Sequence, residues 1–503
     1  MSLLAVDMGS SSCKAVAFSE YGRVLFHKTC QYTPFHSSHP SWAELQADNF
    51  WRAFSAVTQA VSTEVIKDPV EVLAISSHGE TFVPVDTNQR AIAPAILNID
   101  GRAVAESNAL ADALGRRHIF EVTGLAVHPM YPMCKLLWLR EHQPDVFNSA
   151  ARFHAVPDYL LARLGLPGYI DYSLASRFMA FDIRQKQWSV EILSACGLDA
   201  ERLPTPMAAG TVVGKLAAHP AAELGLPAGT RVVLGGHDQP CAALGSGVLE
   251  PGRVSASLGT YECLVAASLT PALSEAALAA NLNSYSHVLP DRYVTIAYFP
   301  SGIMMDWFIH LLYSKDELAS SSVGVLCARL EAQSEHGPSG LCISPHLLGT
   351  CNPDFDPDAS GVVAGIRPTT RRADLYKGIL EGIACEFASM CDLLRETAGS
   401  FRDVYVSGGG VHSALGLKLR AALSGCRLHG MECSEAACQG AAILAGVAAG
   451  KFRSYAEAVE EFVRISESIG SDAVLAESYK QQRLRYSLLY SSLAPVRRTQ
   501  GAT

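Results

Sequence analysis

The chain has 503 residues, of which 49% are hydrophobic and 18% are charged, so it can bury more than one core and we expect at least two domains. Its net charge of −9 and pI near 6.0 argue against a nucleic-acid partner, and no apolar run is long enough to span a membrane. The N-terminus lacks a secretory leader and the 14 cysteines form no C-x-x-C pair, so we expect a cytoplasmic protein with free thiols.

The first predicted element is a hairpin, in which the apolar runs 3–6 and 15–18 form strands on either side of a turn of small residues. Backbone N–H groups and hydroxyls in such a turn can approach a phosphate closely. Asp7 precedes the turn, and a carboxylate beside a phosphate is explained when hydrated Mg²⁺ lies between them. We therefore predict a loop for phosphate and Mg²⁺, with an ordinary glycine hairpin as the alternative. Its residues are Asp7 (to Mg²⁺ through water), Gly9, Ser10, Ser11, Ser12 and Lys14.

Strand-like and helix-like segments alternate along the rest of the chain, which is typical of an α/β protein. Strands are predicted at 72–75, 231–234 and 403–406. The longest predicted helix covers 371–397, where apolar residues recur at helical spacing, and Gly399 is placed to end it. We interpret that apolar stripe as core packing.

A second hairpin is predicted at 252–265, with Gly259 and Thr260 in its turn. Two such hairpins predict two similar halves that face one cleft, each with a turn for phosphate. A third turn, Gly408-Gly409-Gly410, follows a predicted strand and precedes a predicted helix. It can hold the nucleoside end of ATP, or it can be a tight strand-to-helix connection.

Asp238 is the strongest candidate for a catalytic residue. It follows the strand 231–234 and two glycines, and ligands of α/β folds gather at the carboxyl ends of strands. Phosphoryl transfer to an alcohol needs a group that takes the hydroxyl proton, and a carboxylate there can do so. The alternative is that Asp238 is only a helix N-cap.

The most specific motif lies at 130–142, which reads MYPMCKLLWLREH. Taken alone, Leu136 and Trp138 predict core packing and Lys135 a surface charge. The segment fits M-x-P-x-x-K-L-x-W-L-x-[DE]-[NH] at every defined position. This pattern is the signature of the FGGY carbohydrate kinases, and the chain resembles that family from Asp7 to about Gly450.

The resemblance implies two actin-like (ribonuclease H-like) ATPase domains that face a central cleft, at 1–245 for sugar and catalytic base and at 246–503 for the nucleotide. It implies ATP and Mg²⁺ as cofactors and places Asp238 at the catalytic base. Gly259 and Thr260 would hold phosphate, and Gly408, Gly409 and Gly410 with Ser413 would border the adenine. The sugar would be contacted by His78, Glu80, Asp100 and Arg102, as well as by Asp238 itself.

Two departures from the family bear on the substrate. Glycerol kinases carry R-E-T where this chain has Gly79-Glu80-Thr81, and W-x-D-x-R where it has residues 98–102, so glycerol is disfavoured. Xylulokinases carry Q-M-H-G, which residues 76–79 match in part.

We therefore predict an ATP-dependent kinase for a small sugar, most simply a ketose such as xylulose, with no nucleic acid or membrane as partner and a homodimer possible. A polyol, a deoxyketose or a sugar acid are alternative acceptors. The alternatives of another class are an actin-like ATP-driven switch and a non-catalytic sugar sensor.

Overall fold

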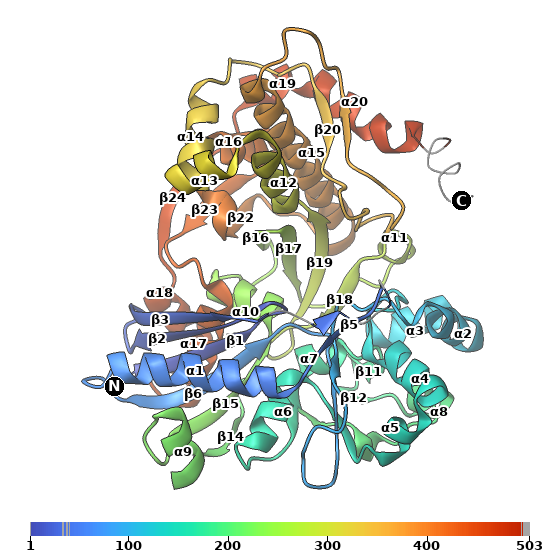
Figure 1. The fold of residues 1–503 in the computed structure, drawn as a ribbon, viewed down its shortest axis with the longest axis vertical. Helices are drawn as coiled ribbons and strands as arrows, with labels where there is room; N and C mark the ends of the chain where they lie inside the picture. Colours follow the sequence, from blue (N-terminus) through green and yellow to red (C-terminus); the bar gives the residue numbers. More distant parts are fainter. Residues whose placement is uncertain (1, 33–34, 37–38, 40, 494, 496–503) are drawn as a thin grey trace.

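Two mixed β-sheets form the centre of the protein, one in the lower and one in the upper half of Figure 1. The computed structural model describes residues 2–32, 35–36, 39, 41–493 and 495. Among these residues, no helix is both long enough and apolar enough to cross a membrane.

The first sheet has the strand order β14-β15-β6-β1-β2-β3. Its strands are β1 (Ser2–Met8), β2 (Ser12–Ser19), β3 (Val24–Gln31), β6 (Val70–Ser77), β14 (Val212–Lys215) and β15 (Arg231–His237). The strands β1, β6 and β15 are parallel, whereas β2, β3 and β14 are antiparallel to their neighbours. The predicted hairpin is present, with Asp7 opposite Lys14 across the β1–β2 pair.

The second sheet has the order β18-β19-β17-β16-β22-β23-β24. Its strands are β16 (Arg253–Leu258), β17 (Tyr261–Ser268), β18 (Asn283–Ser286), β19 (Tyr293–Pro300), β22 (Asp403–Ser407), β23 (Arg427–Met431) and β24 (Ile465–Ile469). The strands β16, β22 and β23 are parallel, and the others are antiparallel to their neighbours.

The two sheets repeat one connection pattern. In each, an antiparallel hairpin precedes two further strands parallel to its first strand, and an antiparallel strand closes that edge. Burial on both faces is what parallel strands require, and β1, β6 and β15 are almost wholly buried. This duplication confirms the predicted α/β fold with two similar halves.

Helices cover both faces of each sheet (Figure 1). The first half contains α1 (Asp48–Glu64), α2 (Val104–Leu114), α3 (Arg116–Thr123), α4 (Pro132–His142), α5 (Pro144–Ser149), α6 (Val156–Arg163), α7 (Tyr172–Ser176), α8 (Val190–Ala195), α9 (Ala218–Leu224) and α10 (Asp238–Gly245). The second half contains α11 (Glu275–Ala279), α12 (Gly302–Leu312), α13 (Lys315–Ser320), α14 (Val323–Ala332), α15 (Arg372–Ala398), α16 (Ala414–Ser424), α17 (Ala436–Ala448), α18 (Tyr455–Phe462), α19 (Ala473–Ser478) and α20 (Lys480–Ser492).

The longest helix, α15, agrees closely with its prediction and ends at Gly399, whose φ of +107° suits glycine. Its apolar stripe, which includes Ile383, Phe387 and Leu394, lies in the core of the second half. The predicted turn at 408–410 differs from expectation in one respect. Its last two glycines belong to a short 3₁₀ turn, Gly409–His412, which precedes the helix α16.

The helices α10 and α17 pack closely where the two halves join. An ideal Cβ on Gly440 would lie 1.9 Å from the carbonyl oxygen of Cys241, and one on Gly245 would lie 2.0 Å from that of Ala436. Only glycine allows the two helices to approach so closely. The first of these helices continues directly from β15, so this contact fixes the position of its first residue, Asp238.

The segment from 436 to 462 lies beyond the predicted boundary at 245–246 but packs on the first sheet. Leu3, Ala5 and Val72 from that sheet share a core with Ile443 and Leu444 of α17. The chain then returns to the second sheet as β24. The division of the chain into 1–245 and 246–503 stays a prediction. The helices α17 and α18 pack against the first half, although they follow residue 245 in the chain.

Candidate functional site

The parallel strands β1, β6 and β15 end at one edge of the first sheet, and polar residues follow each of them. Asp7 lies opposite Ser76 in the register, and the Ser76 hydroxyl donates a 2.9 Å hydrogen bond to its Oδ1. His237, the last residue of β15, pairs with Ser77. The sheet therefore brings Asp7 and Asp238 to the same edge.

Asp238 is the first residue of α10 and not its N-cap, because β15 runs three residues further than predicted. Its Oδ1 is buried and has no hydrogen-bond partner within the described part of the chain, although it lies 3.2 Å from His237 Nε2. Burial, together with the charges of Asp7 and Glu80, raises the pKa of Asp238 well above its usual value. A carboxylate with a raised pKa is a stronger base than an ordinary aspartate.

His237 does not supply a compensating charge. Burial and the neighbouring Arg177 and His78 lower the pKa of His237 well below its usual value, so the ring is neutral at pH 7. Its Nδ1 lies 2.7 Å from the Tyr285 hydroxyl.

Burial also raises the pKa of Asp7, which Ser76 and Lys14 only partly oppose. Lys14 was predicted to face phosphate, but its Nζ donates a 2.8 Å hydrogen bond to Glu435, which lies just before α17. No local sequence pattern predicts this pair, because its two residues lie 421 positions apart in the chain. A direct contact of Lys14 with phosphate stays a prediction.

The loop between β1 and β2 is held by neighbouring segments. The Tyr32 hydroxyl donates to the carbonyl oxygen of Gly9, and the Asn98 side-chain amide donates to Ser10 Oγ at 3.0 Å. Ser11 is exposed and Ser12 is half-buried at the start of β2. The loop therefore presents small side chains from a fixed backbone.

His78 and Glu80 follow β6. Both ring nitrogens of His78 already have protein partners, the carbonyl oxygen of Met8 and Thr81 Oγ1, each at 2.7 Å. Burial lowers its pKa below the usual value. Glu80 has a φ of +63°, which is uncommon for a non-glycine residue and is found preferentially at functional sites.

Arg177 is a residue of this site that sequence reasoning missed. Its Nε donates a 2.5 Å hydrogen bond to Glu80 Oε1, and the guanidinium lies over the rings of Tyr131 and Tyr285 at 5.2 Å and 4.7 Å. Its Nη1 is buried without a partner. The only signal was its place directly after residues 171–176, a segment that already matched the family.

Asp100 and Arg102 bind each other. Asp100 accepts hydrogen bonds from the N–H of Ala43 and from the Arg102 side chain, and Arg102 also pairs with Glu44 at 2.6 Å. The guanidinium lies between the rings of Trp42 and Trp138, at 4.3 Å and 4.7 Å. Both residues are therefore engaged within the protein, and a contact with sugar stays a prediction for each.

Lys135 of the 130–142 motif is fully buried, so its interpretation as a surface charge was wrong. Its Nζ donates to the carbonyl oxygens of Glu80 at 3.1 Å and Leu97 at 2.5 Å. Burial lowers its pKa to about 8. The motif thus connects the two loops that carry Glu80 and Asp100.

A cavity of about 670 Å³ lies in the second half beside the turn 408–410. Gly259, Gly409, Gly410 and Ser413 are among its lining residues, together with apolar side chains such as Met305, Val323 and Leu380. A cavity of this size suits a nucleoside, and Gly259 joins it to the turn of the second hairpin.

The three glycines of that turn differ in their surroundings, and an ideal Cβ on Gly410 would lie 2.7 Å from Cβ of Leu258. Gly408 has a φ of +90°, and a Cβ on it would lie 2.9 Å from the carbonyl oxygen of Leu258. An ideal Cβ on Gly409 would have no described atom within 4 Å, so this glycine faces open space. Ser413 caps α16 and donates to Glu331 at 2.6 Å, so its hydroxyl is already used. These residues fit ATP, with an apolar cavity for the base and Asp7 at the other hairpin for a hydrated Mg²⁺.

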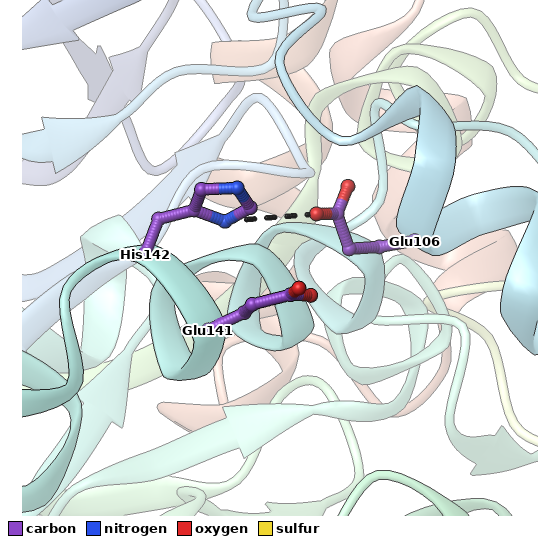
Figure 2. A group of neighbouring side chains, drawn as sticks. All are labelled: Glu106, Glu141 and His142. Carbon is purple, nitrogen blue, oxygen red and sulfur yellow. Dashed lines mark ion pairs between the residues drawn. The ribbon is translucent and has the colours of Figure 1, made fainter.

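A separate group of metal-ligating side chains lies at the far end of α4 from Tyr131 (Figure 2). Glu106 of α2 points toward His142, with 3.7 Å between Oε1 and Nδ1, and Glu141 lies beside them. His142 Nδ1 is also 3.0 Å from the carbonyl oxygen of Trp138, and both Glu141 and His142 are exposed. This group does not belong to the site at the sheet edge.

Comparisons with known proteins agree with this geometry. The model of the FGGY family of carbohydrate kinases, N-terminal domain, matches residues 2–245, and that of its C-terminal domain matches residues 254–449. A xylulose kinase of Escherichia coli (strain K12) is 28% identical over 98% of this chain and 99% of its own. A gluconokinase of Bacillus subtilis (strain 168) is 23% identical over 93% and 90%. The solved structure of ligand-bound xylulose kinase from Lactobacillus acidophilus has a TM-score of 0.89 at 19% identity, covers 98% of each chain and shares the fold.

Proposed function

The chain belongs to the FGGY family of carbohydrate kinases and is an ATP-dependent sugar kinase, and we propose that its acceptor is a ketose such as xylulose. The observation that carries the proposal is the unpartnered Oδ1 of Asp238, which lies beside Glu80 and Asp7 at the end of β15. A xylulose kinase among the relatives supports the choice of ketose. A polyol, a deoxyketose and a sugar acid remain alternatives, the last because one relative is a gluconokinase.

We assign the role of general base to Asp238. It accepts the proton of one sugar hydroxyl while that oxygen forms a bond to the γ-phosphorus, and the bond to the β,γ-bridging oxygen breaks to release ADP. General-base assistance of this kind is worth on the order of 10² to 10⁴ in rate. Burial and the charges of Asp7 and Glu80 raise the pKa of Asp238, and the repulsion from Asp7 decreases when a divalent cation is close.

The nucleotide is assigned to both hairpins and to the cavity. We propose that Gly259 and Thr260 hold phosphate together with the loop from Gly9 to Ser12, and that Gly409, Gly410 and Ser413 border the adenine. Asp7 would hold Mg²⁺ through water, and the cation would neutralise charge on the transferred phosphate. Gly408 has a supporting role, because it packs against Leu258.

The sugar is assigned to the edge of the first sheet. Glu80 is proposed to contact it directly, since a carboxylate suits paired hydroxyls. His78, Asp100 and Arg102 are proposed to hold the loops around it, because their polar atoms have partners within the protein. An ATP-driven switch or a non-catalytic sensor needs no base such as Asp238, so both are disfavoured.

We further propose a cytoplasmic location, where ATP is supplied. A homodimer is proposed as the assembly to test, by light scattering of the purified protein.

The test is release of ADP from MgATP with a panel of xylulose, other ketoses, polyols, deoxyketoses and gluconate, with Asp238→Asn measured in parallel. Turnover with one ketose that is lost in the variant supports the proposal. Unchanged turnover in Asp238→Asn would remove Asp238 from the mechanism, and turnover confined to gluconate would replace the ketose by a sugar acid. Binding of MgATP to the variant serves as the control for folding.

A further inference from the structure

We propose that Arg177 contacts the acceptor sugar through Nη1 and that its ion pair with Glu80 restricts the acceptor to uncharged sugars, excluding aldonates such as gluconate. The inference rests on the proposed function of the site and specifies its substrate class.

The first argument is an unpaired donor. The side chain of Arg177 is 6% exposed, and Nη1 has no hydrogen-bond partner among the residues that the structure describes. A guanidinium N–H that is buried without an acceptor is costly, so such a group indicates a partner that arrives with the ligand. The remaining nitrogens face Glu80, so Nη1 is left to bind the sugar.

The second argument is position. An ideal Cβ on Gly79 would lie 2.7 Å from Cγ of Arg177 and 3.2 Å from Cδ2 of His237. The arginine stem therefore passes over Gly79 beside the residue that precedes Asp238. A side chain at position 79, such as the arginine of the glycerol kinases, would occupy the place that Arg177 fills here. The chain thus has an arginine at its sugar site, supplied from the end of α7 instead of from position 79.

The third argument is charge. The carboxylates of Asp7 and Glu80 both act on Asp238. The nearby cations include Arg177, Lys135 and Lys14, and Lys14 is paired with Glu435. Arg177 is paired with Glu80, and Lys135 donates to two backbone carbonyl oxygens. The pair offers a donor without net positive charge. A hydroxyl or ketone oxygen can accept from it, whereas the carboxylate of an aldonate would enter next to Glu80 and Asp238 and be repelled.

Three variants test the proposal: Arg177→Gln, Glu80→Gln and the double variant. In Arg177→Gln we expect the KM for xylulose to rise about 10- to 100-fold, as for loss of a hydrogen bond to a charged group, with the KM for MgATP unchanged. In Glu80→Gln the charge of Arg177 is no longer balanced by a carboxylate, so the site should accept an aldonate more readily. The ratio of kcat/KM for gluconate to that for xylulose should then rise at least about tenfold. The double variant removes both charges and should lose this gain.

A matched control is Glu71→Gln. Glu71 lies near the start of β6, whereas Glu80 follows three residues after the end of that strand. Glu71 pairs with Arg231 and Lys451 away from the site. Its substitution should leave the sugar preference unchanged. Thermal unfolding of every variant separates a loss of sugar binding from a loss of the fold, and the double variant leaves no unpaired buried charge.

The outcomes distinguish this inference from the proposed function. A wild-type enzyme that phosphorylates xylulose, together with an Arg177→Gln variant of normal KM, overturns the inference and leaves the kinase intact. Equal use of gluconate and xylulose by the wild type overturns it as well. If no sugar of the panel is turned over, the proposed ketose kinase fails, and calorimetry of xylulose and gluconate binding to the same variants still decides the role of Arg177.

Discussion

The contact between α10 and α17 predicts a large effect from a single methyl group. In Gly440→Ala the new Cβ would lie 1.9 Å from the carbonyl oxygen of Cys241. Carbon and carbonyl oxygen approach to about 3.3 Å in close C–H···O contacts, so the helices must separate by roughly 1.4 Å. Since α10 begins at Asp238, the separation moves the carboxylate of Asp238, the proposed general base, relative to Asp7.

The magnitude follows from these distances. Overpacking costs about 1–3 kcal/mol, and the upper end applies because the atom that the methyl meets is backbone. Alanine recovers about 1 kcal/mol through its higher helix propensity. The net loss of about 2 kcal/mol corresponds to a fall in Tm of about 4–8 °C, taking the value for domains of 150–250 residues. A displacement near 1 Å at a catalytic group costs about 10² in kcat.

The assay is thermal unfolding together with ADP release at saturating sugar and MgATP. Gly245→Ala should behave similarly, and the double variant should lose less than the sum of the two, since one separation of the helices relieves both overlaps. Gly470→Ala is the control, because a Cβ there meets nothing within 4 Å. Wild-type Tm and kcat in Gly440→Ala would refute the idea that this contact positions Asp238.

Four other predictions concern buried or paired charges. Because burial and the charges of Asp7 and Glu80 raise the pKa of Asp238, kcat/KM should fall with decreasing pH at values well above those of an ordinary aspartate. Burial and repulsion of the ionised carboxylate destabilise the fold as pH rises through that pKa, so Asp238→Asn should melt above the wild type at pH 7 while losing at least about 10² in kcat. In Glu435→Gln, Lys14 loses its charged partner and its charge can attract phosphate, so the KM for MgATP should fall, more at low salt than at high salt. An unchanged KM would show that Lys14 does not contact phosphate. In Lys135→Met two buried carbonyl oxygens lose their donor, so Tm should fall and the KM for sugar should rise more than that for MgATP.

The sequence predicted those features that depend on local pattern. The hairpin at Asp7, the strand before Asp238 and the helix that ends at Gly399 follow from apolar runs and glycines in one segment each. The glycines of the turn at 408–410 were likewise visible, and two of them, Gly409 and Gly410, border a cavity of suitable size.

What the sequence could not predict depends on residues far apart in the chain. Lys14 meets Glu435, and Arg177 meets Glu80, only because the fold brings those segments together. Lys135 seemed exposed because lysine rarely lies in a core, yet here two loop carbonyls satisfy it. Polar networks of this kind have no periodicity along the chain, so they cannot be predicted from a local sequence pattern.

The return of the chain to the first sheet has a practical consequence for dissecting the protein. A fragment that stops at residue 245 would lack α17 and leave the apolar face formed by Leu3, Ala5 and Val72 open to water. Such a fragment should aggregate when it is produced alone. Supplying residues 436–462 through a linker, as in a circular permutant, should restore its solubility, so we expect the first half to be isolated only as a two-segment assembly.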